Sequence, residues 1–154
     1  MLSFVQGRNT QDVDLIVNRA DVDCIGWHAK VLDRDFAEAS FRGIRVDLLL
    51  STNPLFDEVK RTERARATFG TREVPSVTRE GLLLLKLYAL PSLYRQNKLA
   101  RAALYETDIL MLHQGAEVDD QRLIDRLRPH LPQYDVSELD GILREQRQRR
   151  RFAD

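Results

Sequence analysis

Two carboxylates, Asp12 and Asp14, stand one residue apart at the head of an apolar run that ends at Val17. Side chains alternate between the two faces of a β-strand, so a strand here would point both carboxylates the same way. A third carboxylate, Asp47, lies inside a second apolar run at 43–50. Apolar strands rarely bury an unpaired carboxylate, because removing the charge from water is costly. Oxygen ligands on neighbouring strands suit one or two Mg²⁺ ions that hold a substrate's phosphates.

A structural explanation of these carboxylates stays open. Asp12 could be a turn residue at the entry to its strand, and Asp47 could pair with Arg45 or Arg8. We favour a cation site because Asp12 and Asp14 share a face, and because a free charge in the middle of the second strand would be costly. The chain between the two runs also has a length that lets a hairpin bring the strands side by side.

Composition limits the class of protein. The 154 residues suffice for one domain with a real core, and 43% hydrophobic content is typical of a globular protein. A net charge of zero argues against a general coat for nucleic acid or membrane surfaces. The single Cys24 excludes an intramolecular disulfide and a multi-cysteine zinc site, which favours the cytoplasm. The longest apolar stretch, at 81–85, is too short to cross a bilayer, and no signal peptide is visible.

The first half of the chain predicts strands with few helices. Arg42-Gly43 predicts the turn of a β-hairpin, and Asn53-Pro54 predicts a helix start that continues to Gly70. Pro75 confines its strand to an edge, because proline cannot donate to a central ladder. The predicted elements of this half are strands at 12–17, 31–41, 43–50 and 73–77, a short helix within 19–30, and a helix at 54–70.

The second half predicts only helices. Thr78 caps a helix that is apolar nearly all round, and Pro91 bends or breaks it. Further helices are predicted at 97–114, 119–131 and 137–151. The fold class is therefore α/β in the broad sense (α+β): a small mixed sheet flanked by helices in 1–78, with a helical part in 79–154. We expect the two parts to pack as one compact domain, because the sheet alone is small.

An ordered set of motifs resembles a known family. Arg8, Thr10, Asp12 and Asp14, followed by Asp47, resemble the signature of minimal nucleotidyltransferases of the DNA polymerase beta-like superfamily, in particular the bacterial abortive-infection-toxin-like members. The segment 74–90, with Lys86 on its helix, resembles the family's short strand and lysine-bearing helix. Arg95 and the pair Asp108-Ile109 resemble motifs that follow it. The resemblance covers roughly 1–113.

The resemblance implies roles for six residues. Asp12, Asp14 and Asp47 would be the catalytic residues and the ligands of Mg²⁺ or Mn²⁺, and Asp47 would also help to activate an attacking hydroxyl. Arg8, Thr10 and Lys86 would bind the nucleotide. Each of these three has an alternative: a surface salt bridge for Arg8, a turn for Thr10, and pairing with Asp108 for Lys86.

One motif of the family does not occur in this sequence. A Gly-Gly or Gly-Ser turn normally precedes the Asp-x-Asp strand and cradles the nucleotide's phosphates. The sequence instead begins with 1–7, which resembles the remainder of the helix that follows that turn. If the turn is absent from the protein, we expect weak triphosphate binding. An exposed sheet edge would then favour a homodimer.

The expected function is Mg²⁺-dependent transfer of a nucleoside monophosphate from an NTP to an acceptor hydroxyl of RNA, protein or a small molecule. An alternative is a catalytically inactive member of the fold that acts by protein association, for example with a cognate toxin or antitoxin. A third hypothesis is a metal-dependent nuclease that uses the same carboxylates. No membrane partner is expected.

Overall fold

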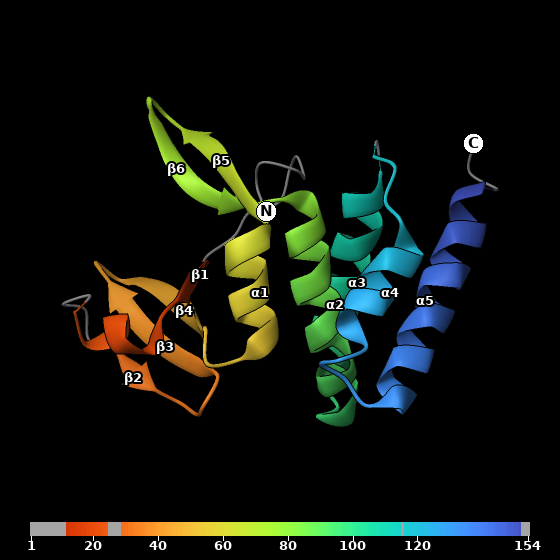
Figure 1. Cartoon of the computed structure of the whole chain (residues 1–154), viewed down its shortest axis with the longest axis horizontal. Coiled ribbons are helices and arrows are strands. Elements are labelled where there is room, and N and C mark those ends of the chain that lie inside the picture. The colour runs from red at the N-terminus through yellow and green to blue at the C-terminus, as the bar shows by residue number, and fades with distance from the viewer. Residues whose placement is uncertain (1–11, 25–28, 115, 152–154) are drawn as a thin grey trace. The chain divides into compact units, whose positions relative to one another are not determined.

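The computed structural model describes residues 12–24, 29–114 and 116–151, without the side chains of Asp12 and of 149–151. The chain forms a sheet unit that ends at Val77 and a helical unit that starts at Thr78. The placement of the units relative to each other is not determined, so each is described by itself (Figure 1). The predicted fold class is confirmed: the fold is mixed α+β, with a small mixed sheet and helices that include the C-terminal ones.

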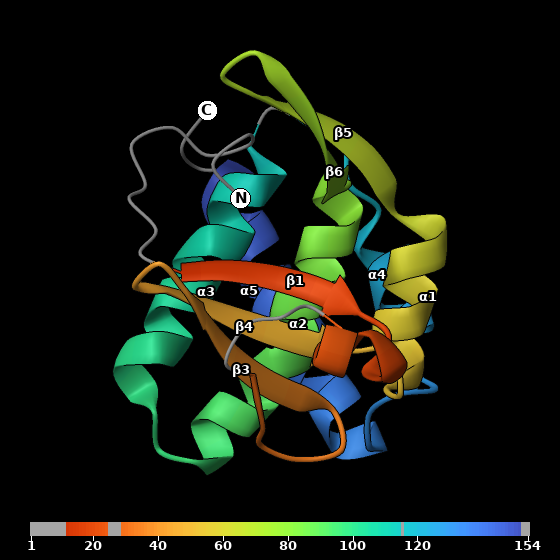
Figure 2. The same cartoon turned by 90° about the vertical axis from the view of Figure 1, so that its left-hand side faces the viewer.

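The main sheet has four strands in the order β1-β4-β3-β2, which Figure 2 shows nearly face-on for β1, β4 and β3. The central strand β4 pairs in parallel with β1 and antiparallel with β3. The short β2 pairs antiparallel with β3 and closes the other edge. The bounds of these strands are β1 Asp12–Val17, β2 Lys30–Val31, β3 Phe36–Phe41 and β4 Ile44–Leu50.

The predicted hairpin between β3 and β4 is confirmed. Its two turn residues, Arg42 and Gly43, have φ angles of 50° and 80°. Two-residue turns with positive φ at both positions match the right-handed twist of the flanking strands. The turn pairs Phe41 with Ile44 and thereby sets the register of every later pair along the hairpin.

One face of this sheet is apolar and forms a core. Alternate residues of β3 and β4 point into it, as period two requires. The 3₁₀ helix η1 (Arg19–Cys24) covers this face with Val22, which is 1% exposed. The predicted short helix after β1 is therefore confirmed within the described residues. The buried members of this core are Val22, Ala37, Ala39, Val46, Leu48 and Leu50.

Helix α1 (Pro54–Thr62) begins as predicted, with Asn53 as its N-cap and proline at its first position. The Asn53 side chain accepts hydrogen bonds from the backbone N–H of Leu55 at 3.0 Å and of Phe56 at 3.4 Å. It also donates to the Asp35 carboxylate at 3.1 Å, which ties the helix start to the loop before β3. Satisfying these N–H groups is what allows α1 to start at this point.

The prediction that α1 continues to Gly70 is wrong. The helix ends at Thr62, and strands β5 (Arg64–Phe69) and β6 (Arg72–Val77) form a separate two-stranded hairpin. Arginine and alanine favour helix locally, but here pairing with β6 outweighs that preference. Gly70 lies in the turn with a φ of 61°, which glycine adopts without strain. The strand predicted at 73–77 is confirmed as β6, outside the main sheet.

The helical unit contains α2 (Arg79–Arg95), α3 (Leu99–His113), α4 (Asp120–Leu127) and α5 (Gln133–Arg151). Thr78 caps α2 as predicted and accepts a hydrogen bond from the Gly81 N–H at 3.1 Å. The helix continues through Pro91 rather than breaking there. Among the described helices, none has the length and apolar character needed to cross a membrane. The unit's fully buried leucines include Leu83, Leu84, Leu87, Leu90, Leu112, Leu123, Leu127 and Leu139.

The N-cap of α1 gives a direct test of the sheet unit. Replacing an asparagine cap by alanine removes an acceptor from two N–H groups, so Asn53→Ala should lower the free energy of unfolding by about 1–2 kcal/mol. Urea denaturation followed by circular dichroism measures the change. Asn53→Ser keeps a capping oxygen and should recover most of the loss. Equal stability of the alanine variant and the wild type would contradict this account of the helix start.

Candidate metal centre on the mixed sheet

Two of the three carboxylates predicted from sequence, Asp14 and Asp47, lie side by side on the second face of the main sheet. Asp14 of β1 is in register with Asp47 of β4, and Asp47 is in register with Glu38 of β3. Residues in register on neighbouring strands point to the same face. We call Asp14, Asp47 and Glu38 the carboxylate row. The rows on either side of it are Ile16, Leu49 and Phe36, and Asp12, Arg45 and Ser40.

The apolar neighbour of the carboxylate row anchors α1. The Phe36 and Phe56 rings meet edge to face with centroids 5.5 Å apart, so α1 covers that end of the face. The carboxylate row itself stays open to solvent: Asp14 is exposed, and the Asp47 and Glu38 side chains are 21% and 44% exposed. This corrects the argument that Asp47 would be a costly free charge in an apolar strand. The strand is apolar on its other face.

Arg45 lies beside the carboxylate row and holds two of its members. Its Nε is 2.8 Å from Asp47 Oδ1, and its Nη2 is 3.3 Å from Glu38 Oε2. The pairing of Asp47 with Arg45, which the sequence left open, is therefore present. The Arg45 side chain is 54% exposed, and exposed ion pairs of this kind contribute less than about 1 kcal/mol. The guanidinium thus supplies a positive charge beside Asp47 and Glu38, but these ion pairs hold it only weakly.

The donor set fits a magnesium ion. Mg²⁺ in enzymes usually takes one or two protein carboxylates, keeps several waters and completes its shell with substrate phosphates. Asp14 and Asp47 lie on adjacent strands, which are about 4.8 Å apart in a sheet, and offer only oxygen ligands. Among the described side chains, which leave out that of Asp12, no set of three or more His, Cys, Asp or Glu is grouped so that it could hold a metal ion.

The predicted nucleotide-binding residues are not all described. Arg8 and Thr10 lie outside the described residues, and of Asp12 only the backbone is described, in register with Arg45. Lys86 belongs to the helical unit, where its Nζ lies 2.8 Å from Asp108 Oδ2 and 4.3 Å from the centre of the Tyr105 ring. The alternative partner of Lys86 is therefore present. A nucleotide-binding role for Lys86 stays a prediction.

Glu38 and Arg45 were not among the site residues predicted from sequence, although a signal for both existed. The pairing of a hairpin with a two-residue turn can be counted outward from that turn. Starting from Phe41 and Ile44, this count places Arg45 opposite Ser40 and Asp47 opposite Glu38. The two-residue turn therefore already determines which side chains flank Asp47 on this face.

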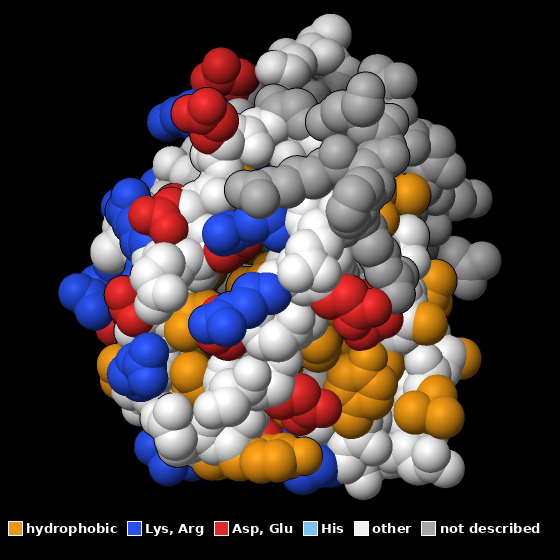
Figure 3. All heavy atoms as spheres, turned by 90° about the vertical axis from the view of Figure 1, so that its right-hand side faces the viewer, with side chains coloured by type: hydrophobic (Ala, Val, Ile, Leu, Met, Phe, Trp, Pro, Cys, Tyr) orange, Lys and Arg blue, Asp and Glu red, His pale blue; other side chains and the backbone are white. Residues whose placement is uncertain are grey.

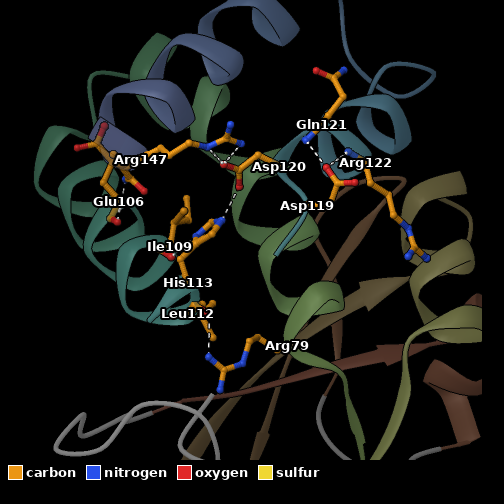
Figure 4. A network of polar contacts seen from close by, with 11 residues as sticks. Arg79, Glu106, Ile109, Leu112, His113, Asp119, Asp120, Gln121, Arg122 and Arg147 are labelled. Atoms are coloured by element: carbon orange, nitrogen blue, oxygen red, sulfur yellow. Dashed lines mark hydrogen bonds and ion pairs between the residues drawn. The ribbon is translucent and has the colours of Figure 1, made fainter. Parts of the chain in front are cut away.

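A second polar cluster lies inside the helical unit (Figure 4). His113 of α3 is buried; its Nδ1 lies 2.7 Å from the Ile109 carbonyl oxygen and its Nε2 2.7 Å from Asp120 Oδ1. Arg147 of α5 donates from Nη2 and Nε to Asp120 Oδ2 at 2.6 Å and 3.1 Å. Both ring nitrogens of His113 are engaged, and the cluster ties α3, α4 and α5 together.

Comparison with known proteins does not assign the chain to a family. Neither a protein-family model nor a curated protein sequence matches the chain. The likeness to minimal nucleotidyltransferases is therefore a prediction from the motifs, and the functional argument depends on the carboxylate row.

The helical cluster predicts how stability depends on pH. Burial alone would raise the pKa of the Asp120 carboxyl, but hydrogen bonds from His113 and Arg147 outweigh burial and hold that pKa below its usual 3.8. A lowered pKa in the folded state stabilises the protein above the unfolded pKa, and this stabilisation is lost as the pH falls through the folded pKa. Urea denaturation at pH 7 should therefore show Asp120→Asn to be less stable than the wild type, with a gap that narrows in acid. The control Asp125→Asn, on the same helix, should show a small gap at both pH values.

The carboxylate row predicts how Arg45 affects metal binding. Removing a positive charge about 5 Å from a bound cation is worth about 1 kcal/mol in a well-hydrated site, or roughly fivefold in affinity. Arg45→Gln should therefore bind Mn²⁺ about fivefold more tightly than the wild type, as measured by isothermal titration calorimetry without nucleotide. Arg34→Gln removes an exposed arginine of the same unit from outside the row and should bind Mn²⁺ as the wild type does. Weaker binding by Arg45→Gln would contradict competition between Arg45 and the metal.

Proposed function

We propose that this protein is a Mg²⁺-dependent nucleotidyltransferase, which transfers a nucleoside monophosphate from an NTP to an acceptor hydroxyl. One observation carries the proposal. Asp14 and Asp47 are in register on neighbouring parallel strands, on a face that α1 leaves open at this point. Asp14 of the Asp-x-Asp segment thereby presents its carboxylate beside Asp47, and the motif resemblance implies such an arrangement for this chemistry.

The reaction makes limited demands on the protein. The acceptor oxygen attacks the α-phosphorus, the bond between that phosphorus and the bridging oxygen breaks, and pyrophosphate leaves with the bonding electrons. Asp47 would accept the proton of the attacking hydroxyl. A bound Mg²⁺ would neutralise charge on the phosphates and on the pyrophosphate as it leaves. Asp14 and Asp47 would hold that ion, and the same open face would admit the acceptor.

A non-catalytic role for the same fold is the second candidate, and specific contacts favour it. Arg45 already compensates Asp47, and Lys86 is tied to Asp108 by a short ion pair. In such a protein the carboxylate row would be a permanently salt-bridged surface, and the chain would act by associating with another protein, such as a cognate toxin or antitoxin. Tight Mg²⁺ binding would not be needed.

Labelling separates the two candidates. The full chain is incubated with α-³²P-labelled NTPs, Mg²⁺ and a cell extract, and the labelled product is tested for sensitivity to ribonuclease and to protease. The proposal expects label in an acceptor and a loss of at least about 100-fold in Asp47→Asn, because a proton acceptor and metal ligand is removed. The matched control Asp57→Asn, in α1 of the same unit, pairs with Arg61 outside the carboxylate row and should keep full activity.

Three other results would overturn the proposal. Equal labelling by the wild type and by Asp47→Asn would remove Asp47 from the chemistry. Absence of Mg²⁺-dependent NTP binding in calorimetry would favour the non-catalytic candidate. Mg²⁺-dependent cleavage of nucleic acid without any NTP would assign the carboxylates to a nuclease.

A further inference from the structure

The β5–β6 hairpin carries an exposed aromatic ring at its turn. Phe69 is the last residue of β5, and 75% of its surface is exposed. Figures 1 and 2 show the hairpin as a ribbon distinct from the four-stranded sheet. An isolated two-stranded hairpin is marginally stable in water. Because the Phe69 ring at its tip is mostly exposed, it contributes little to the stability of the fold.

The register sorts the side chains of the hairpin onto two faces. Phe69 is in register with Arg72, so the ring and this arginine are neighbours on one face. Arg64 and Arg66 lie on the opposite face, two residues apart along β5 and therefore about 6.6 Å from each other. An aromatic ring with an arginine beside it offers a base a surface to stack on and its phosphate a cation.

The hairpin carries a net positive charge. Residues 64–77 contain three arginines and one acidic residue, Glu73, which gives a net charge of +2 in a chain whose total is zero. Glu73 is 3.4 Å from Arg66, and both side chains are largely exposed. Such a pair contributes little, so a phosphate can replace Glu73 at low cost.

On the face of the molecule that Figure 3 shows, basic and acidic side chains are intermixed. Several arginines of the helical unit are paired with carboxylates on the same or a neighbouring helix, as in Arg144 with Asp140 and Arg122 with Glu80. A mixed surface attracts polyanions weakly, because the opposite charges cancel within a Debye length.

The geometry points to the β5–β6 hairpin as a binding surface for single-stranded nucleic acid. A base stacks on Phe69, Arg72 engages the adjacent phosphate, and Arg64 and Arg66 add attraction from the other face. Stacking on an aromatic ring tolerates every base, so the surface selects single strands rather than a sequence. Binding needs neither NTP nor Mg²⁺, so this inference and the proposed nucleotidyl transfer stand or fall separately.

Fluorescence anisotropy with a labelled oligouridine probe tests the inference, using the full chain at low ionic strength in EDTA. Phe69→Ala should weaken binding by at least about fivefold, because it removes a stacking platform. Arg72→Gln should also weaken binding and should reduce the slope of log K against log salt by about 1, because one phosphate contact is lost.

Matched variants keep the test sharp. Tyr134→Ala removes an aromatic ring of equal exposure, 76%, from α5, and Arg61→Gln removes an exposed arginine from α1. Both should bind the probe as the wild type does, and thermal melts followed by circular dichroism check that all variants fold. Failure of the wild type to bind, or equal losses in Phe69→Ala and Tyr134→Ala, would overturn the inference. Loss of a dimer in Phe69→Ala, seen by analytical ultracentrifugation with no change in probe affinity, would assign the ring to a contact between copies instead.

Discussion

The register of β4 against both of its neighbours is the constraint on which the sheet unit depends. Side chains alternate along this strand, so one fixed register sends Val46, Leu48 and Leu50 into the core and sends Asp47 to the open face. A slip of one residue against either neighbour would exchange the two sets. Leucines would then meet water and a carboxylate would enter the core. The free energy that forms the core is therefore the same free energy that aligns Asp14, Asp47 and Glu38.

Alignment of three carboxylates creates repulsion, which the unit relieves locally. Like charges directly opposite each other on neighbouring strands are destabilising. Arg45 reduces this cost by bridging Asp47 and Glu38, while its own exposure keeps the bridge weak. In the proposed function, a metal ion would replace this weakly held guanidinium beside Asp47.

The sequence carried most of the local information and little of the long-range information. The Arg42-Gly43 turn, the Asn53 cap and the Thr78 cap depend on a few adjacent residues, and all three predictions are confirmed. The prediction of a helix as far as Gly70 is wrong. The arginine and alanine residues of β5 favour a helix locally, but pairing with β6 makes this segment a strand. Whether Lys86 points to a nucleotide or to Asp108 depends on how α2 meets α3, which no spacing along one helix reveals.

Variants of the buried ion pairs in the helical unit and variants of the carboxylate row give different information. Asp108 is fully buried beneath Lys86, and Asp120 is 5% exposed between His113 and Arg147, so each carries a charge that its partner must compensate. Removing one partner of a buried pair typically costs about 3–5 kcal/mol, a large part of the roughly 5–15 kcal/mol by which a native protein is stable. A Lys86 variant that loses activity would therefore report a weakened helical unit as readily as a lost phosphate contact. The carboxylate row is exposed. On its own face of the sheet, only α1 connects it to buried side chains. Its variants change charge with little change in packing, so they test the proposed metal site most directly.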